Sequence, residues 1–138
     1  MLKDKFGRKH DYLRISITEN CNFRCTYCMP IEDYPFVPQK NMMSKDEIVT
    51  IIRTFANLGI KKVRFTGGEP LMRKDFIEIL EAIQDLNLSL HLTTNGLLLG
   101  RYLQDFKKLG LTSINISIDS LNQEKFKALT HRDHLSKV

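Results

Sequence analysis

The sequence predicts an α/β fold in which four parallel strands are joined by crossover helices. Short segments in which apolar and polar residues alternate, as in β-strands, recur four times along the 138 residues. Segments with helical spacing of apolar residues lie between them, so the order is β-α-β-α-β-α-β. Such alternation is typical of one parallel sheet with right-handed crossovers. No linker, repeat or low-complexity segment interrupts it, and we expect one domain over residues 1–138.

The strand predictions rest on alternating apolar residues. Residues 1–10 are polar, so we expect a mobile lead-in there with a turn at Gly7. Leu13, Ile15 and Ile17 then alternate with polar residues and open the sheet. The four predicted strands span residues 11–18, 61–66, 88–93 and 114–118.

The helix predictions rest on apolar spacing and on start and stop signals. Prolines make the segment up to about residue 43 irregular. Ser44 and Glu47 form a capping box, after which apolar residues recur with helical spacing until Gly59. The other predicted helices are 74–86, 99–109, which stops at Gly110, and a short one at 122–129, capped by Ser120 or Asn122.

Composition is that of a soluble globular protein, with 42% hydrophobic and 27% charged residues. There is no apolar run long enough for a membrane span and no signal-peptide core, so we expect a cytoplasmic protein without a membrane partner. The net charge of +5 invites a nucleic-acid partner. No basic run is interleaved with aromatic residues, however, so a solvated surface is the better interpretation and we expect no nucleic-acid binding.

All three cysteines lie within eight residues, as Cys21, Cys25 and Cys28 in the spacing C-x3-C-x2-C. Thiolates bind iron–sulfur clusters and zinc, and a closed site usually has four protein ligands. Three cysteines leave one metal position open, which is what a catalytic site needs. The spacing therefore indicates a [4Fe–4S] cluster with one iron reserved for a small molecule. A structural zinc site or a redox pair remains the alternative.

All four predicted strands end in polar or glycine-rich sequence, and in parallel sheets function gathers at the carboxyl ends of the strands. Gly67 and Gly68 permit close approach of backbone to a ligand, although an ordinary turn explains them equally well. The four endings are Cys21–Cys28, Thr66–Pro70, Thr93–Gly96 and Ser117–Asp119.

Several polar residues lie within the predicted strands. Arg14 lies between apolar residues, and if it points inward, a bound anion would offset the cost of burying a guanidinium. The alternative is a salt bridge to Asp119 or Glu69. Arg64 is open to the same two interpretations. Ser117 and Asp119 would point inward from strand four if its isoleucines face the helices.

The three motifs together resemble those of radical S-adenosylmethionine (radical SAM) enzymes. These are the cysteine motif Cys21–Cys28, the Gly-Gly-Glu-Pro sequence from Gly67 to Pro70, and Ser117-Ile-Asp119. The longer strings around Arg14, Arg73 and Thr93 resemble one branch of that family, the GTP 3′,8-cyclases of molybdenum cofactor biosynthesis. The likeness runs across nearly the whole chain.

The resemblance implies a set of ligands. Cys21, Cys25 and Cys28 would hold the [4Fe–4S] cluster, whose open iron binds S-adenosyl-L-methionine. Positions that contact this cofactor in the family match Tyr27, Gly68 and Ser117. Positions that contact GTP match Arg14, Arg64 and Thr93. No side chain is implied as a catalytic group, because the radical is generated on the cofactor.

The reaction implied is a lyase reaction. An external one-electron donor reduces the cluster, a 5′-deoxyadenosyl radical forms, and GTP becomes (8S)-3′,8-cyclo-7,8-dihydroguanosine 5′-triphosphate. The alternatives are a radical SAM enzyme that modifies a peptide and a non-catalytic iron–sulfur or zinc module.

One departure from the family is length. Its members are more than twice as long and carry a second three-cysteine cluster near the C-terminus. We therefore expect an N-terminal part, an incomplete TIM-like (β/α) barrel of about four strands. An unpaired edge at strand four would make this N-terminal part marginally stable and prone to associate, for example as a homodimer. We also expect the N-terminal part by itself to be inactive on GTP.

Overall fold

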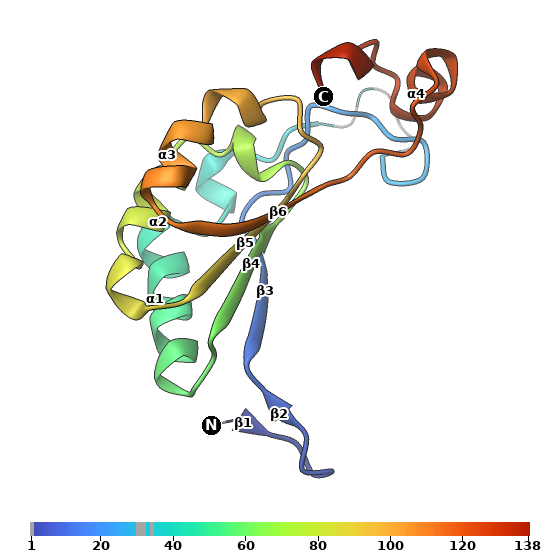
Figure 1. Ribbon diagram of the computed structural model, residues 1–138. Coiled ribbons are helices and arrows are strands. Elements are labelled where there is room, and N and C mark those ends of the chain that lie inside the picture. Colours follow the sequence, from blue (N-terminus) through green and yellow to red (C-terminus); the bar gives the residue numbers. More distant parts are fainter. Residues whose placement is uncertain (1, 30–32, 34) are drawn as a thin grey trace.

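Four parallel strands form the centre of the computed structural model, which describes residues 2–29, 33 and 35–138 (Figure 1). The sheet order β3-β4-β5-β6 follows the chain, as expected for successive right-handed crossovers. The strands are β3 (Tyr12–Ser16), β4 (Lys62–Thr66), β5 (Ser89–Thr94) and β6 (Leu111–Ile116). This arrangement confirms the predicted α/β class with four parallel strands and crossover helices.

Three helices cover one face of the sheet (Figure 1). They are α1 (Lys45–Asn57), α2 (Phe76–Glu81) and α3 (Leu103–Lys108). The predicted capping box of α1 is present, with both hydrogen bonds between Ser44 and Glu47. The fourth helix, α4 (Gln123–Thr130), lies apart from these three, beside the cysteine loop.

Several predicted boundaries were wrong. The helix expected at 74–86 ends at Glu81 and is followed by a 3₁₀ turn, Gln84–Leu86, and by Asn87 in the left-handed region. The helix expected at 99–109 starts as a 3₁₀ turn, Leu99–Arg101. Strand four begins three residues earlier than predicted and stops at Ile116. Helix ends lie where tertiary packing stops supporting the turn, which local periodicity does not show.

The N-terminal residues, for which we expected a mobile lead-in, form a small hairpin. Strands β1 (Leu2–Lys3) and β2 (Lys9–His10) pair in antiparallel fashion. The predicted turn is present, with Gly7 at φ +78°, a conformation that glycine adopts without strain. The Asp4 carboxylate accepts hydrogen bonds from two backbone N–H groups inside the turn, which stabilises it.

The hydrophobic core lies between the helices and one face of the sheet. Ile48 and Ile52 of α1 and Val63 and Phe65 of β4 are completely buried. Phe76 of α2 joins the layers, since its ring packs edge-on against a ring in β4 and another in α3. The core therefore fixes the strands against the helices and leaves their carboxyl ends free to carry polar residues.

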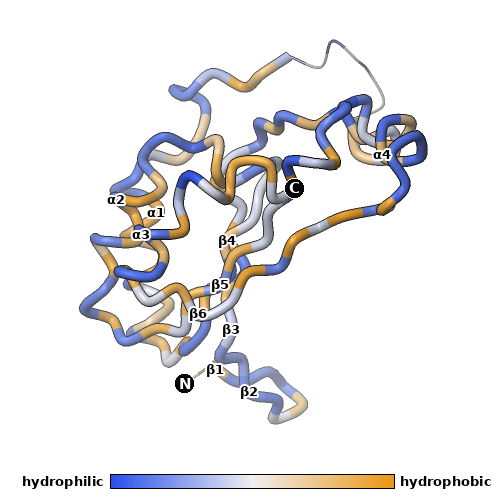
Figure 2. Tube along the Cα trace, turned by 45° about the horizontal axis from the view of Figure 1, so that its top comes forward, coloured by the Kyte–Doolittle hydropathy of each residue, from blue (hydrophilic) through white to orange (hydrophobic). Residues whose placement is uncertain are grey.

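The outer part of β6 is apolar and less well covered. Figure 2 shows hydrophobic colouring along the segment that leaves β6 toward α4. Ile116 and Ile118 are 43% and 39% exposed. Of the three isoleucines in the predicted fourth strand, only Ile114 packs against the core, so the condition on which Ser117 and Asp119 would point inward is met only in part.

The opposite face of the sheet is polar. Arg14, Arg64 and His91 occupy neighbouring register positions on β3, β4 and β5. In a closed (β/α) barrel this face would point into the barrel interior. Within the described part of the chain, no helix is long and apolar enough to cross a membrane.

Candidate metal and cofactor site

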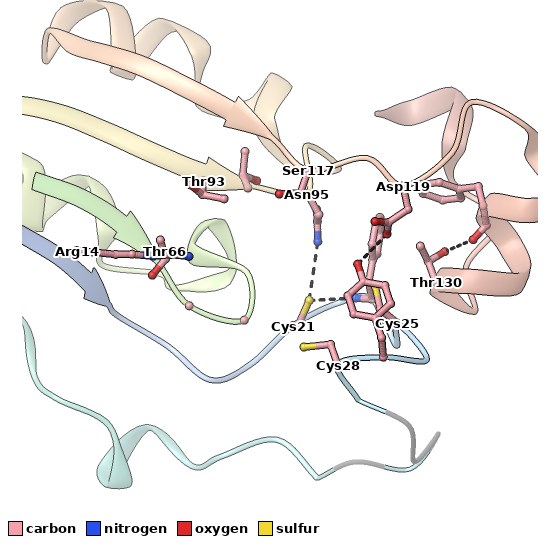
Figure 3. A pocket seen from close by; sticks show the side chains of 16 residues that line it. Arg14, Cys21, Cys25, Cys28, Thr66, Thr93, Asn95, Ser117, Asp119 and Thr130 are labelled. Carbon is pink, nitrogen blue, oxygen red and sulfur yellow. Dashed lines mark hydrogen bonds between the residues drawn. The ribbon is translucent and has the colours of Figure 1, made fainter.

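A cavity of about 180 Å³ lies at the carboxyl ends of the four strands. Segments far apart in sequence form it: the cysteine loop, the glycine pair after β4, the end of β5, the segment after β6, and α4 (Figure 3). The convergence predicted for the strand ends is therefore present. Among the predicted site residues, the cavity is lined by Arg14, Cys21, Cys25, Tyr27, Cys28, Gly68, Thr93 and Ser117. Arg64 does not line it.

The cysteine loop turns so that its thiols share the cavity. The backbone N–H groups of Cys28 and Met29 both donate to the carbonyl of Cys25, at 2.9 and 2.8 Å, and close a tight turn. Figure 3 shows the sulfur atoms of Cys21 and Cys28 directed toward the same space. All three thiols are free. Among the described residues, no three His, Cys, Asp or Glu side chains are gathered closely enough to hold a single ion.

Burial affects two of the thiols directly. Desolvation raises the pKa of Cys21 and of Cys25 above the ordinary value of 9.0. A hydrogen bond from the backbone N–H of Phe23 to Cys21 Sγ, 3.4 Å long, acts in the opposite direction. Burial therefore favours the protonated form of the Cys21 and Cys25 thiols. Because metals bind the thiolate, loading a metal at this site must release protons.

The last turn of α4 holds the cysteine loop in place. The N–H groups of Arg24 and Thr26 donate to the carbonyls of Thr130 and Leu129, at 3.0 and 2.9 Å. A helix leaves its last carbonyls without partners, and here the loop supplies them. The Phe23 and Phe126 rings also pack edge-on at 5.7 Å.

Further contacts strengthen this junction. Arg132 Nε donates to the carbonyl of Asn22 at 2.9 Å. The Arg24 guanidinium donates to the carbonyls of Cys21 and Phe23 within the loop. Sequence reasoning did not anticipate this role of α4, because the partners are about 100 residues apart. The sequence signal for this role is general: the last carbonyls of any helix lack partners within the helix and need hydrogen-bond donors from elsewhere.

The glycine pair allows two backbone segments to approach each other. The N–H of Gly68 donates to the carbonyl of Thr18 at 2.8 Å, and the N–H of Glu69 donates to the carbonyl of Asn20 at 2.7 Å. A Cβ atom on Gly68 would lie 2.4 Å from Asn20 O. The close approach predicted here is thus an approach to the start of the cysteine loop, while Gly67 and Gly68 also line the cavity.

Glu69 connects the loops that follow β4 and β5. Its side chain is completely buried. The carboxylate accepts hydrogen bonds from the Thr94 hydroxyl, the Asn95 N–H and the Leu71 N–H, at 2.7, 2.7 and 3.0 Å. Burial raises the pKa of Glu69, and these three hydrogen bonds oppose that rise. This buried carboxylate therefore holds the backbone at Leu71 and at Asn95 in place.

A second buried charge stabilises the start of the cysteine loop. Arg73, 3% exposed, pairs with Asp75 through two hydrogen bonds. Its Nη1 donates to the carbonyl of Ile17 at 2.7 Å, where β3 passes into the loop. A buried guanidinium needs such partners, and here they belong to the backbone that leads to Cys21.

Arg14 does not point into a buried interior. Its side chain is exposed on the open face of the sheet, at the margin of the cavity. No ion pair links it to Asp119 or Glu69 in the described residues. The burial argument for a bound anion therefore does not apply to Arg14. Its guanidinium is accessible to a ligand instead.

Arg64 is held by its neighbours on the same face. Its guanidinium donates to Tyr12 Oη at 3.1 Å and to Thr93 Oγ1 at 3.2 Å. A third contact, 3.4 Å long, joins Arg64 Nη2 to His91 Nδ1. The structure thus places the Arg64 and Thr93 side chains in direct contact.

Ser117 and Asp119 lie beyond the end of β6 rather than on it. The Ser117 N–H still donates to the carbonyl of Thr94 at 2.8 Å, so the segment continues along β5 for one more residue. Both residues line the cavity. Tyr27 Oη donates to Asp119 Oδ2 at 2.8 Å, which raises the pKa of the Tyr27 phenol.

The sequence matches a known protein family and several known proteins along most of its length. Residues 15–138 match the model of the Radical SAM superfamily. The chain is 50% identical over 141 aligned residues to a GTP 3′,8-cyclase of Listeria monocytogenes, covering 100% of this chain and 42% of that protein. It is 48% identical to the human molybdenum cofactor biosynthesis protein 1, covering 99% of this chain and 22% of that protein.

A solved structure shows the same fold. Streptococcus suis SuiB bound to its precursor peptide SuiA superposes with a TM-score of 0.74 at 20% identity, over 90% of this chain and 28% of SuiB. The fold is accordingly that of a partial TIM-like barrel. With a family match over most of its length and its cysteines at the carboxyl edge of that sheet, this chain belongs to the radical SAM superfamily.

Proposed function

We propose that this chain holds a [4Fe–4S] cluster through Cys21, Cys25 and Cys28 and binds S-adenosyl-L-methionine at the iron that the protein leaves open. One observation carries the proposal: all three thiols line one cavity together with the carboxyl ends of all four strands. The donor set fits, because three soft thiolates suit a cluster and leave one iron without a protein ligand. When bound, the cluster and S-adenosyl-L-methionine together would supply one-electron chemistry that yields a carbon-centred radical.

The cavity residues bind and orient the cofactor. Gly68 and Ser117 both line the cavity, where Gly68 offers its backbone and Ser117 a hydroxyl. Tyr27, between Cys25 and Cys28 in the sequence, is held by a hydrogen bond to Asp119. These three residues are the proposed cofactor contacts. The cysteine loop itself is immobilised by α4, which keeps the thiols in place before a cluster binds.

The proposed substrate is GTP, and the proposed reaction is its conversion to (8S)-3′,8-cyclo-7,8-dihydroguanosine 5′-triphosphate in molybdenum cofactor biosynthesis. Support comes from the 50% identity to the Listeria GTP 3′,8-cyclase, although the chain spans only 42% of that relative. Arg14, Arg64 and Thr93 are the proposed GTP contacts. Arg14 and Arg64 are register partners on neighbouring strands, and two adjacent guanidinium groups favour an anionic ligand.

We expect a cytoplasmic protein whose single domain, residues 1–138, receives electrons from an external one-electron donor. Peptide modification is the second candidate, because the chain shares its fold with SuiB. That likeness is at 20% identity, so it supports the fold alone, and the GTP reaction remains the better supported function.

The test is anaerobic reconstitution with iron and sulfide. We expect about four irons per chain and an electron paramagnetic resonance (EPR) signal of the reduced cluster that changes when S-adenosyl-L-methionine is added. Cys28→Ser should prevent stable loading. Cofactor binding should weaken in Ser117→Ala but not in the matched control Ser120→Ala, which lies outside the cavity. Stoichiometric zinc, or an iron signal indifferent to the cofactor, would overturn the proposal.

The GTP site needs its own measurement. Calorimetric titration of the reconstituted protein with GTP should show weaker binding in Arg64→Ala than in the parent protein. Arg101→Ala, which removes an exposed guanidinium near α3, is the matched control and should leave binding unchanged. Equal affinity in both variants would contradict the assignment of GTP to this face of the sheet.

A further inference from the structure

Asn95 is held in a single orientation directly beside Cys21. Its backbone N–H donates to Glu69 Oε2 at 2.7 Å. Its side-chain oxygen accepts from the N–H of Leu97 at 3.1 Å, an Asx turn. Its side-chain nitrogen donates to Asn22 Oδ1 at 2.7 Å. Because the Leu97 N–H occupies the oxygen, the amide cannot be flipped, and its NH₂ group must face the cysteine loop.

That NH₂ group also reaches a sulfur atom. Asn95 Nδ2 lies 3.9 Å from Cys21 Sγ (Figure 3). The NH₂ group has two hydrogens, so one can serve Asn22 while the other points to the sulfur. Cys21 Sγ also accepts from the Phe23 N–H at 3.4 Å. Two N–H groups, one from the backbone and one from a side chain, are therefore directed at this sulfur.

We propose that Asn95 is a positioning residue for the cluster ligand Cys21: its side-chain amide donates a hydrogen bond to the Cys21 thiolate and raises the reduction potential of the cluster. This inference rests on the proposed function. The amide contacts a ligand and not the reacting atoms. Glu69 takes part through Asn95, because its carboxylate holds the Asn95 backbone in place.

The direction of the effect follows from charge. One electron from an external donor adds negative charge to a cluster and to its thiolate ligands. A hydrogen-bond donor at a ligand sulfur stabilises that charge, so the reduced form becomes more favourable. Removing the Asn95 donor should lower the potential. The Phe23 donor belongs to the backbone and remains in every side-chain variant.

Two variants at Asn95 test this with the reconstituted chain. Asn95→Ser removes the NH₂ donor without adding charge, and its hydroxyl can still accept from Leu97. Asn95→Asp keeps the size and the accepting oxygen but replaces the donor by a carboxylate. Asn22→Asp is the matched control, because it adds the same charge beside Cys21 and keeps an oxygen for Asn95 Nδ2.

The readout is the midpoint potential of the cluster, measured by EPR-monitored titration with dithionite. We expect the one-electron reduction constant to fall about tenfold in Asn95→Ser, which corresponds to about 59 mV. The midpoint potential should be lower in Asn95→Asp than in Asn22→Asp. Iron and sulfide content and far-ultraviolet circular dichroism establish that each variant is folded and loaded.

The outcomes separate this inference from the proposed function. If the parent chain takes up no cluster, the proposed function fails. If clusters load but Asn95→Ser keeps the parent potential, the role of Asn95 is wrong. A second measurement needs no variant at Asn95: Asn22→Asp protein carrying ¹⁵N-labelled asparagine side chains should show a weak ¹⁵N coupling to the reduced cluster in pulsed EPR. Absence of that coupling in loaded protein would also overturn the inference.

Discussion

The Thr94 hydroxyl donates a 2.7 Å hydrogen bond to Glu69 Oε1, joining the loop after β4 to the end of β5 inside the protein. Both residues are buried, with exposed fractions of 2% and 0%. The same carboxylate accepts two backbone N–H groups, so it takes up three donors that would otherwise be unsatisfied. The cavity wall behind Cys21 therefore depends on one buried acid.

Removing the carboxylate should destabilise the protein strongly. Glu69→Ala leaves three buried donors without an acceptor, and each costs about 1–3 kcal/mol, so we expect a loss of about 3 kcal/mol or more in the free energy of unfolding. Urea denaturation measures it. The control Glu78→Ala removes an exposed carboxylate that pairs with Lys45 and should cost less than about 1 kcal/mol. Equal losses in the two variants would contradict the role of Glu69.

The raised pKa of Glu69 makes its contribution to stability depend on pH. The folded protein binds this proton more tightly than the unfolded chain, because burial penalises the carboxylate. Its stabilising contribution is therefore full below the unfolded pKa and is lost as the pH rises through the folded pKa.

The measurement compares the parent protein with Glu69→Gln, which cannot titrate. The difference in free energy of unfolding between them should move in favour of the variant as the pH rises from about 4 toward neutrality. The control is Glu78→Gln, which removes an exposed carboxylate and shows how much of the pH dependence comes from losing any one charge. A difference that moves in favour of the parent protein would show that the hydrogen bonds, and not burial, dominate.

Gly68 should not tolerate a side chain. An alanine Cβ would lie 2.4 Å from Asn20 O and 2.5 Å from Glu19 O, and these are backbone atoms that cannot rotate away. We expect Gly68→Ala to cost about 1–3 kcal/mol and to lower iron uptake, since the displaced segment leads directly to Cys21. Thermal unfolding and iron content measure the two effects.

Gly100→Ala is the control for that prediction. Nothing lies within 4 Å of a Cβ at Gly100, and this residue is within a 3₁₀ turn. The substitution should be neutral or slightly stabilising, because it restricts the unfolded chain. If Gly100→Ala and Gly68→Ala have the same effect, close approach is not the reason for Gly68.

Loss of the Phe126 ring should loosen the cysteine loop. Phe126 is 1% exposed and packs against Phe23. Phe126→Ala should cost about 3–5 kcal/mol at this junction and release the hydrogen bonds from Arg24 and Thr26 to the end of α4. Hydrogen exchange of those two amides should accelerate. Leu121→Ala, at a residue that is 84% exposed, should leave their exchange unchanged. Undiminished protection in Phe126→Ala would show that α4 does not hold the loop.

The parts of the fold that could be predicted depend on neighbours in sequence. The capping box at Ser44 needs only a residue three positions away, and the alternation around Ile15 is visible within one strand. The convergence of the strand ends also followed from sequence, because successive crossovers in a parallel sheet bring all carboxyl ends to one edge.

Other features depend on distant residues and were not predictable. The sequence left open whether Arg14 points inward, and in the structure it is exposed on the open face of the sheet. The contact of Asn95 with Cys21 joins positions 74 residues apart. Polar residues between apolar ones indicate a face of a strand, but not what covers that face.

The sequence by itself determined which ligands are available: three thiols in one loop, placed after the first strand of a parallel sheet, in a chain of the radical SAM superfamily. Ligand type and spacing are properties of the chain. Only the tertiary structure decided how the loop is held, with Thr130 and Leu129 accepting from it and Asn95 directed at Cys21. The physical reason is that hydrogen bonds and packing act over a few ångströms, and only folding brings residues 22–26, 95 and 126–132 within that range.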